Sequence, residues 1–173
     1  MAHVVFLRAA NVGGHRVFQP AAFARELSEL GVVNVGAAGT FVVRASKTEA
    51  AIRRAFTQKL PFAADLMICP ERDILGLPDV PDFAVKPPED TKLYLTVMAS
   101  AVRPTPRLPL LQPDGGGWCV KIIATHGRYV LSLNRRMGKR LYYPNELVEK
   151  SFGQPATTRN WTTVIKLVEI LSQ

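Results

Sequence analysis

The sequence predicts an α+β fold made of two ferredoxin-like halves of the βαββαβ type, each an antiparallel sheet with its helices on one face. Strand-like and helix-like patterns follow one another as β-α-β-β-α-β over roughly the first 70 residues. The segment 78–91 is rich in proline and poor in either period, which is typical of a linker. New strand and helix patterns follow it. We therefore expect a domain over 1–77, a linker over 78–91 and a second α+β domain over 92–173.

The first strand and helix are marked by their boundaries. Residues 4–9 begin with a β-branched and aromatic run that ends in turn-forming residues, as an interior strand does. Pro20 suits the first turn of a helix, where its missing N–H costs nothing, and Gly31 suits the position just after the last turn. A helix over 20–30 would bury residues spaced i, i+4 and i+7, which are Phe23, Leu27 and Leu30.

The rest of the first half contains three strands and a second helix. Ser46 followed by Glu49 fits a capping box, so we expect a helix over 47–59 that buries Ile52 and Phe56. The predicted strands cover 32–35, 40–44 and 64–69.

The second half repeats this plan imperfectly. Alternating residues predict a strand over 92–98, but Pro104, Pro106, Pro109 and Pro113 argue against a helix in the segment 99–113. Two further strands, 118–125 and 129–133, form a hairpin around a turn at His126 and Gly127. The chain then shows a short helix over 144–150 and a longer one over 160–171.

Charge is distributed unevenly along the chain. Its net charge of +8 comes mainly from residues 86–173, which hold thirteen Lys and Arg against six Asp and Glu, whereas residues 1–85 hold nine against eight. No acidic residue lies between Asp114 and Glu146. A field of one sign favours anionic partners. If the partner is a nucleic acid, the residues that would bind it are Arg128, Arg135, Arg136, Lys139 and Arg140.

The opening loop is a second candidate for anion binding. Asn11, Gly13 and Gly14 can all adopt positive φ, so consecutive N–H groups could turn toward one point beside the cation Arg8. The alternative is that the glycine pair is only a sharp exit from the first strand and that Arg8 reaches solvent. A single glycine pair does not decide between these interpretations.

Two motifs at opposite ends of the chain give it a specific resemblance to a known protein family. The opening LRAANVGGH and the closing GQPATTRNWTTVIKLVEI resemble the uncharacterised bacterial family known as domain of unknown function 1697. The resemblance covers nearly the whole chain and implies two ferredoxin-like halves, but no activity. Where relatives have Arg-Gly-Ile-Asn and Gln-Ser-Gly-Asn, this chain has Arg8-Ala9-Ala10-Asn11 and Ala37-Ala38-Gly39-Thr40. A family site using those polar groups would be partly lost here.

We expect the two motifs to form one ligand-binding site. In this hypothesis the closing motif supplies Thr157, Thr158, Arg159 and Asn160 at the start of the final helix, where unpaired N–H groups favour an anion. The opening loop supplies Arg8, Asn11, Gly13 and Gly14. The alternative gives each residue a structural role: Thr158 or Asn160 caps the helix, Trp161 packs in the core, and Arg159 pairs with a carboxylate or with carbonyls.

Three classes of function follow. We favour a cytoplasmic binding module for a phosphate-bearing ligand or partner, with nucleic-acid binding through the basic second half as one alternative. The other is an enzyme of unidentified reaction. No known catalytic motif is present, so the only candidates to test are Arg8, His15 and Arg159. Cys69 and Cys119 are interpreted as buried thiols in a reducing compartment. We expect no metal, no cofactor and no membrane segment, and the oligomeric state is undetermined.

Overall fold

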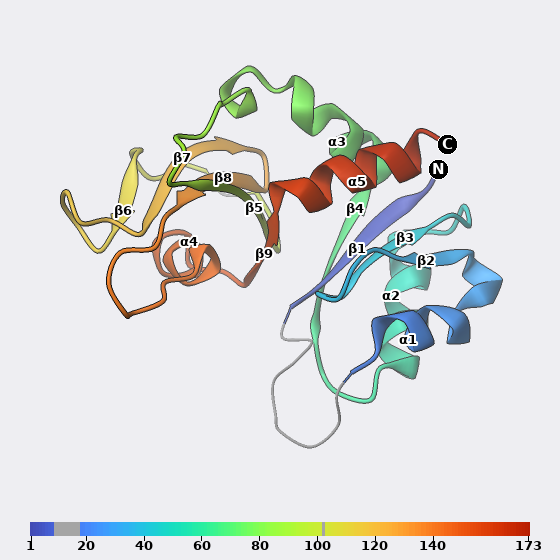
Figure 1. The fold of residues 1–173 in the computed structure, drawn as a ribbon. Coiled ribbons are helices and arrows are strands. Elements are labelled where there is room, and N and C mark those ends of the chain that lie inside the picture. Colours follow the sequence, from blue (N-terminus) through green and yellow to red (C-terminus); the bar gives the residue numbers. More distant parts are fainter. Residues whose placement is uncertain (9–17, 102) are drawn as a thin grey trace. The chain divides into compact units, whose positions relative to one another are not determined.

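The computed structural model describes residues 1–8, 18–101 and 103–173, and these residues form an α+β fold with two antiparallel sheets (Figure 1). Their contacts divide the chain into two compact units. Unit 1 holds Met1–Gly76 and Ile165–Gln173, and unit 2 holds Leu77–Val164. The sequence-based division instead places residues 165–173 with the second half.

The sheet of unit 1 is centred on β1 (His3–Arg8). This strand pairs with β3 (Thr40–Val43) on one edge and with β4 (Asp65–Pro70) on the other. Since β2 (Val32–Asn34) pairs with β3, the strand order is β2-β3-β1-β4. With α1 after β1 and α2 after β3, the predicted β-α-β-β-α-β order is confirmed for this unit.

The helices α1 and α2 contribute to one apolar core. Residues of α1 (Pro20–Glu26) and α2 (Glu49–Lys59) pack against alternate residues of the sheet, such as Val5 and Leu7. The rings of Phe23, Phe41 and Phe56 meet edge to face, with centroids 5.4 to 5.7 Å apart. This face of the sheet is apolar throughout the core cluster, as the sequence pattern predicts.

The first helix begins and stops where its sequence indicates. Pro20 occupies the first turn, but the α-helix ends at Glu26 and continues as a 3-10 turn over Ser28–Leu30. Gly31 follows with φ of 59°, in the left-handed region that favours glycine. A Cβ on Gly31 would also lie 3.2 Å from the Cβ of Arg44.

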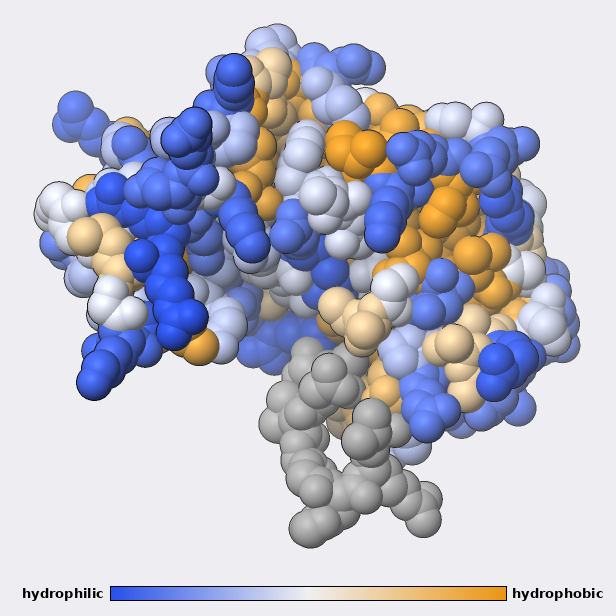
Figure 2. Space-filling model, in the orientation of Figure 1, coloured by the Kyte–Doolittle hydropathy of each residue, from blue (hydrophilic) through white to orange (hydrophobic). Residues whose placement is uncertain are grey.

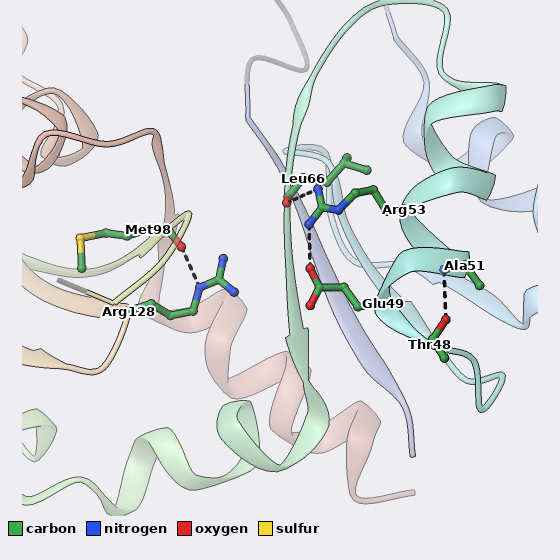
Figure 3. A network of polar contacts seen from close by, with 7 residues as sticks. All are labelled: Thr48, Glu49, Ala51, Arg53, Leu66, Met98 and Arg128. Carbon is green, nitrogen blue, oxygen red and sulfur yellow. Dashed lines mark hydrogen bonds and ion pairs between the residues drawn. The ribbon is translucent and has the colours of Figure 1, made fainter.

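The prediction that Ser46 caps the second helix is wrong, because Thr48 holds that position. The Thr48 hydroxyl accepts a hydrogen bond from the Ala51 N–H at 3.2 Å (Figure 3). The Ser46 hydroxyl instead accepts from the N-terminal amine of Met1. Glu49, the second member of the expected box, pairs with Arg53 one turn later at 2.8 Å.

The sheet of unit 2 is centred on β5 (Lys92–Met98). This strand lies between β8 (Tyr129–Asn134) and β9 (Ala156–Asn160), and β7 (Val120–His126) pairs with β8. The order β7-β8-β5-β9 thus repeats β2-β3-β1-β4 of unit 1. The two units therefore share a strand plan.

The second unit departs from that plan at the segment 99–113. Where a helix follows β1 in unit 1, unit 2 has a short edge strand, β6 (Leu110–Gln112), paired with β7. The prolines identified from the sequence explain the missing helix, because each lacks an N–H donor. The helix α4 (Pro144–Phe152) packs on the sheet through Leu147, Val148 and Phe152.

The segment 78–91 contains more structure than the predicted linker. After α3 (Glu71–Gly76), which the sequence analysis missed, come 3-10 turns over Leu77–Asp79 and Pro81–Phe83. Phe83 is 2% exposed, and its ring lies 6.4 Å from the ring of His126 and 6.2 Å from that of Trp161. This segment is therefore a packed part of unit 2.

The capping assignment gives a stability test. Replacing Thr48 by alanine should lower the free energy of unfolding by about 1 kcal/mol, because the Ala51 N–H loses its acceptor. Ser46→Ala is the matched control and should cost less than half as much, since Ser46 caps no helix. Urea denaturation followed by circular dichroism measures both. A larger loss for Ser46→Ala would restore the capping box and overturn the assignment to Thr48.

Candidate functional site

Arg8, the cation of the opening motif, ends β1 and pairs across the sheet. Its Nη1 lies 3.1 Å from the Oδ2 of Asp65, the residue opposite it on β4. Both side chains are partly exposed, so the pair contributes little to stability. Asn11, Gly13, Gly14 and His15 lie outside the described residues, so the predicted loop site stays a prediction.

The closing motif is a strand and not the start of a helix, which corrects one expectation. Thr157 to Asn160 belong to β9, and the final helix α5 (Trp161–Leu171) begins after them. Because side chains alternate along a strand, Thr157 and Arg159 project to one face of the sheet and Thr158 and Asn160 to the other. The four side chains therefore do not converge from a helix N-terminus.

Asn160 and Thr158 have structural roles, as the alternative interpretation allowed. The Asn160 Oδ1 accepts a hydrogen bond from the Thr162 N–H at 3.2 Å and so caps α5. The Thr158 hydroxyl lies 2.7 Å from the hydroxyl of Thr96, its register partner on β5. Each residue connects β9 to a neighbouring element.

Arg159 is a buried cation with 5% of its surface exposed. Its Nη1 donates to the Thr157 hydroxyl at 2.8 Å and to the Thr158 carbonyl at 2.9 Å. Burial lowers the pKa of Arg159 to about 10, so the side chain is still a cation at neutral pH. A desolvated charge needs strong acceptors around it.

A polar strip on the inner face of the second sheet was not recognised in the sequence. Register pairing aligns Ser132 with Tyr94 and Thr96 with Thr158 on the face that α4 covers. Within the described part of unit 2, the buried side-chain oxygens that lack a hydrogen-bond partner are Ser132 Oγ, Asn134 Oδ1 and Gln112 Oε1. Ser132 and Asn134 alternate with leucines along β8, and the sequence shows this alternation. The same alternation also fits a sheet face that is exposed to solvent, so it does not indicate a buried polar strip.

Arg128 and Arg135, predicted to bind nucleic acid, form hydrogen bonds that hold unit 2 together. The Arg128 Nε donates to the Met98 carbonyl at 2.7 Å (Figure 3). The Arg135 Nε donates to the Trp118 carbonyl at 2.8 Å, and its Nη2 donates to the Gly116 carbonyl at 2.6 Å. Its guanidinium also stacks 3.8 Å from the centroid of the Trp118 ring.

The other three predicted cations are exposed on what we call the basic loop, residues 135–143, between β8 and α4. Arg136, Lys139 and Arg140 are all exposed there, and the Arg140 guanidinium lies 4.9 Å from the centroid of the Tyr142 ring. Gly138 turns the loop with φ of 73°. Figure 2 shows that hydrophilic side chains dominate the surface of unit 2 around this loop. The sequence thus identified an exposed cationic segment.

Among the described residues, no group of three or more His, Cys, Asp or Glu side chains is placed to hold a metal ion. No helix in the described ranges is long and apolar enough to cross a membrane. Cys69 and Cys119 are buried free thiols, as predicted.

The polar strip allows a stability test that compares a hydroxyl without a hydrogen-bond partner, that of Ser132, with a hydroxyl that has one, that of Thr96. Ser132→Ala should leave the free energy of unfolding unchanged or raise it, because it removes a buried hydroxyl that has no partner. Thr96→Val should lower it by about 1 kcal/mol, since the Thr158 hydroxyl then loses its partner. Equal losses in thermal or urea denaturation would mean that Ser132 has an unrecognised partner.

Comparison with known proteins shows similarity in fold and family. The conserved bacterial protein SP0830 of Streptococcus pneumoniae is 15% identical, with a TM-score of 0.62 over 98% of each chain, which shows a common fold. No curated protein matches the sequence. The pattern of the family described as "Protein of unknown function (DUF1697)" matches residues 1–117. This match covers more than half of the chain and agrees with the resemblance seen in its motifs, so the chain belongs to that family.

Proposed function

We propose that the chain is a binding module for a phosphate-bearing anionic ligand or partner, and that the basic loop of unit 2 makes the contact. One observation carries the proposal. Arg136, Lys139 and Arg140 are exposed within five residues of one another, in a stretch from 115 to 145 without any acidic residue. Their charges are not offset by acidic residues nearby in the sequence.

Such a cluster suits phosphate for physical reasons. Guanidinium groups present fixed pairs of N–H donors that match phosphate oxygens, and a lysine adds a mobile point charge. The loop is supported at its base, because the Arg135 N–H donates to the Cys119 carbonyl at 2.9 Å while its guanidinium holds Trp118 and Gly116. A supported loop loses less entropy when it binds than a free one does.

Charge removal tests the proposal. Replacing Arg136, Lys139 and Arg140 together by glutamine should weaken binding of tripolyphosphate by about tenfold or more, because three exposed charges are lost. Isothermal titration calorimetry at low ionic strength measures the affinity. The matched control changes three exposed cations of unit 1, Arg25, Arg54 and Lys59, to glutamine. It leaves the same net charge as the test variant.

If both triple variants lose affinity equally, the ligand responds to net charge and the basic loop is not a site. If the parent protein does not bind tripolyphosphate even at low salt, the loop is a solvated surface. Either result overturns the proposal.

Arg8 of unit 1 and Arg159 of unit 2, the cations of the two family-like motifs, are separate candidates for binding the same class of ligand. If these residues bind phosphate, Arg8→Gln and Arg159→Gln should each remove the phosphate-dependent rise in melting temperature. The rise must be compared within each variant, because Arg159 is buried and its loss can change stability directly. A rise that survives in both variants excludes Arg8 and Arg159 as phosphate-binding residues.

A further inference from the structure

The basic loop exposes apolar side chains among its cations. Met137 is 45% exposed, Leu141 56% and Tyr143 51%. The other exposed large hydrophobic residues in the described chain are Met1, Val33 and Ile165, which lie far from this loop in sequence. Exposed apolar groups of this size, gathered in one short segment, are typical of a binding surface.

Aromatic rings also lie against cations at this end of unit 2. Arg135 stacks on Trp118, and the Lys121 Nζ lies 5.8 Å from the same ring. Arg140 lies over Tyr142. Tyr143 follows immediately, and as the residue before α4 its side chain makes no capping hydrogen bond. The surface therefore combines planar groups with positive charge.

Segments distant in sequence hold this surface in place. The Cys119 thiol lies 3.8 Å from the Met137 carbonyl, and Arg135 bonds to the carbonyls of both Gly116 and Trp118. The first residues of the basic loop are thus fixed to the segment 116–119. Arg135 and the Trp118 ring at the base of the loop are thus positioned before any ligand arrives, which lowers the entropic cost of binding.

We infer that the occupant of the basic loop is a single-stranded nucleic acid. Its phosphates would meet Arg136, Lys139 and Arg140, and an unstacked base would lie on the exposed ring of Tyr143. Proteins that bind single strands without sequence preference combine these two features, a cationic track and aromatic rings. The inference rests on the proposed function, because the same cations bind the phosphates, and it specifies the partner.

Two other partners fit the loop less well. A duplex keeps its bases stacked and offers no free face to Tyr143. An anionic membrane is bound by amphipathic helices with a continuous apolar face, whereas the described residues 135–143 contain no helix. In the loop, cations separate Met137 from Leu141. Both alternatives are included as competing ligands in the test.

The test measures binding of the full chain to a fluorescein-labelled oligothymidylate of about 20 nucleotides by fluorescence anisotropy. We expect binding that weakens steeply between about 50 and 200 mM salt, with a smaller salt slope after the three cations become glutamine. Tyr143→Ala should weaken binding by about 5- to 150-fold, the loss typical of one base-aromatic stack. Tyr143→Trp should retain affinity, and Tyr143→Leu should behave like the alanine variant.

Several outcomes would overturn the inference. A duplex of the same length that binds as tightly would exclude single-strand recognition, and so would an unchanged affinity in Tyr143→Ala. Binding to vesicles of phosphatidylcholine and phosphatidylserine, without binding to the oligonucleotide, would assign the loop to a membrane surface. Tripolyphosphate distinguishes the two proposals. If it binds through the three cations while Tyr143 has no effect on the oligonucleotide, only the nucleic-acid inference fails.

Discussion

Each sheet depends on a central strand that is hydrogen-bonded along both edges. This strand is β1 in unit 1 and β5 in unit 2. Each central strand pairs with two strands that follow it much later in the chain, so the fold rests on contacts between distant segments. Val4 to Leu7 are at most 1% exposed, and Leu95, Val97 and Met98 are fully buried. The pairing also fixes which side chains share a face. It brings Thr96 against Thr158 and separates Arg159 from Asn160.

The two units show how one strand plan accommodates different sequences. In unit 1 the helix-bearing face carries only apolar residues in its core cluster, and two helices cover it. In unit 2 the segment after the central strand contains Pro104, Pro106 and Pro109 and forms the edge strand β6 in place of a helix. The corresponding face holds Thr96 and Ser132, both fully buried, beside an apolar cluster packed on α4. Unit 2 therefore tolerates polar groups on a face that is apolar in unit 1.

Local signals predicted most elements, and contacts between distant segments account for the failures. Pro20, Gly31 and the alternation of residues 92–98 act within a few residues, so they could be interpreted from sequence alone. The strand β9 could not, because TTRN has no strong pattern of its own and is extended through its pairing with β5. The bulge between Ile122 and Ala124 is likewise a shift in the pairing of β7 with β8, which no local pattern indicates. In the candidate site, the sequence identified the cations but could not show which are buried.

The division of the cations into those engaged within the fold and those exposed to solvent decides how the positive charge can act. Arg159 is desolvated, and Arg128 and Arg135 donate to backbone carbonyls, so part of the excess charge in the second half is engaged within the fold. Arg136, Lys139 and Arg140 extend into solvent from a loop whose base Arg135 holds. An anion arriving from solution meets these three first, at close range and with no acidic residue nearby in the sequence. Binding strength should therefore follow the few exposed charges of the basic loop, and the total of +8 sets only the weaker long-range attraction.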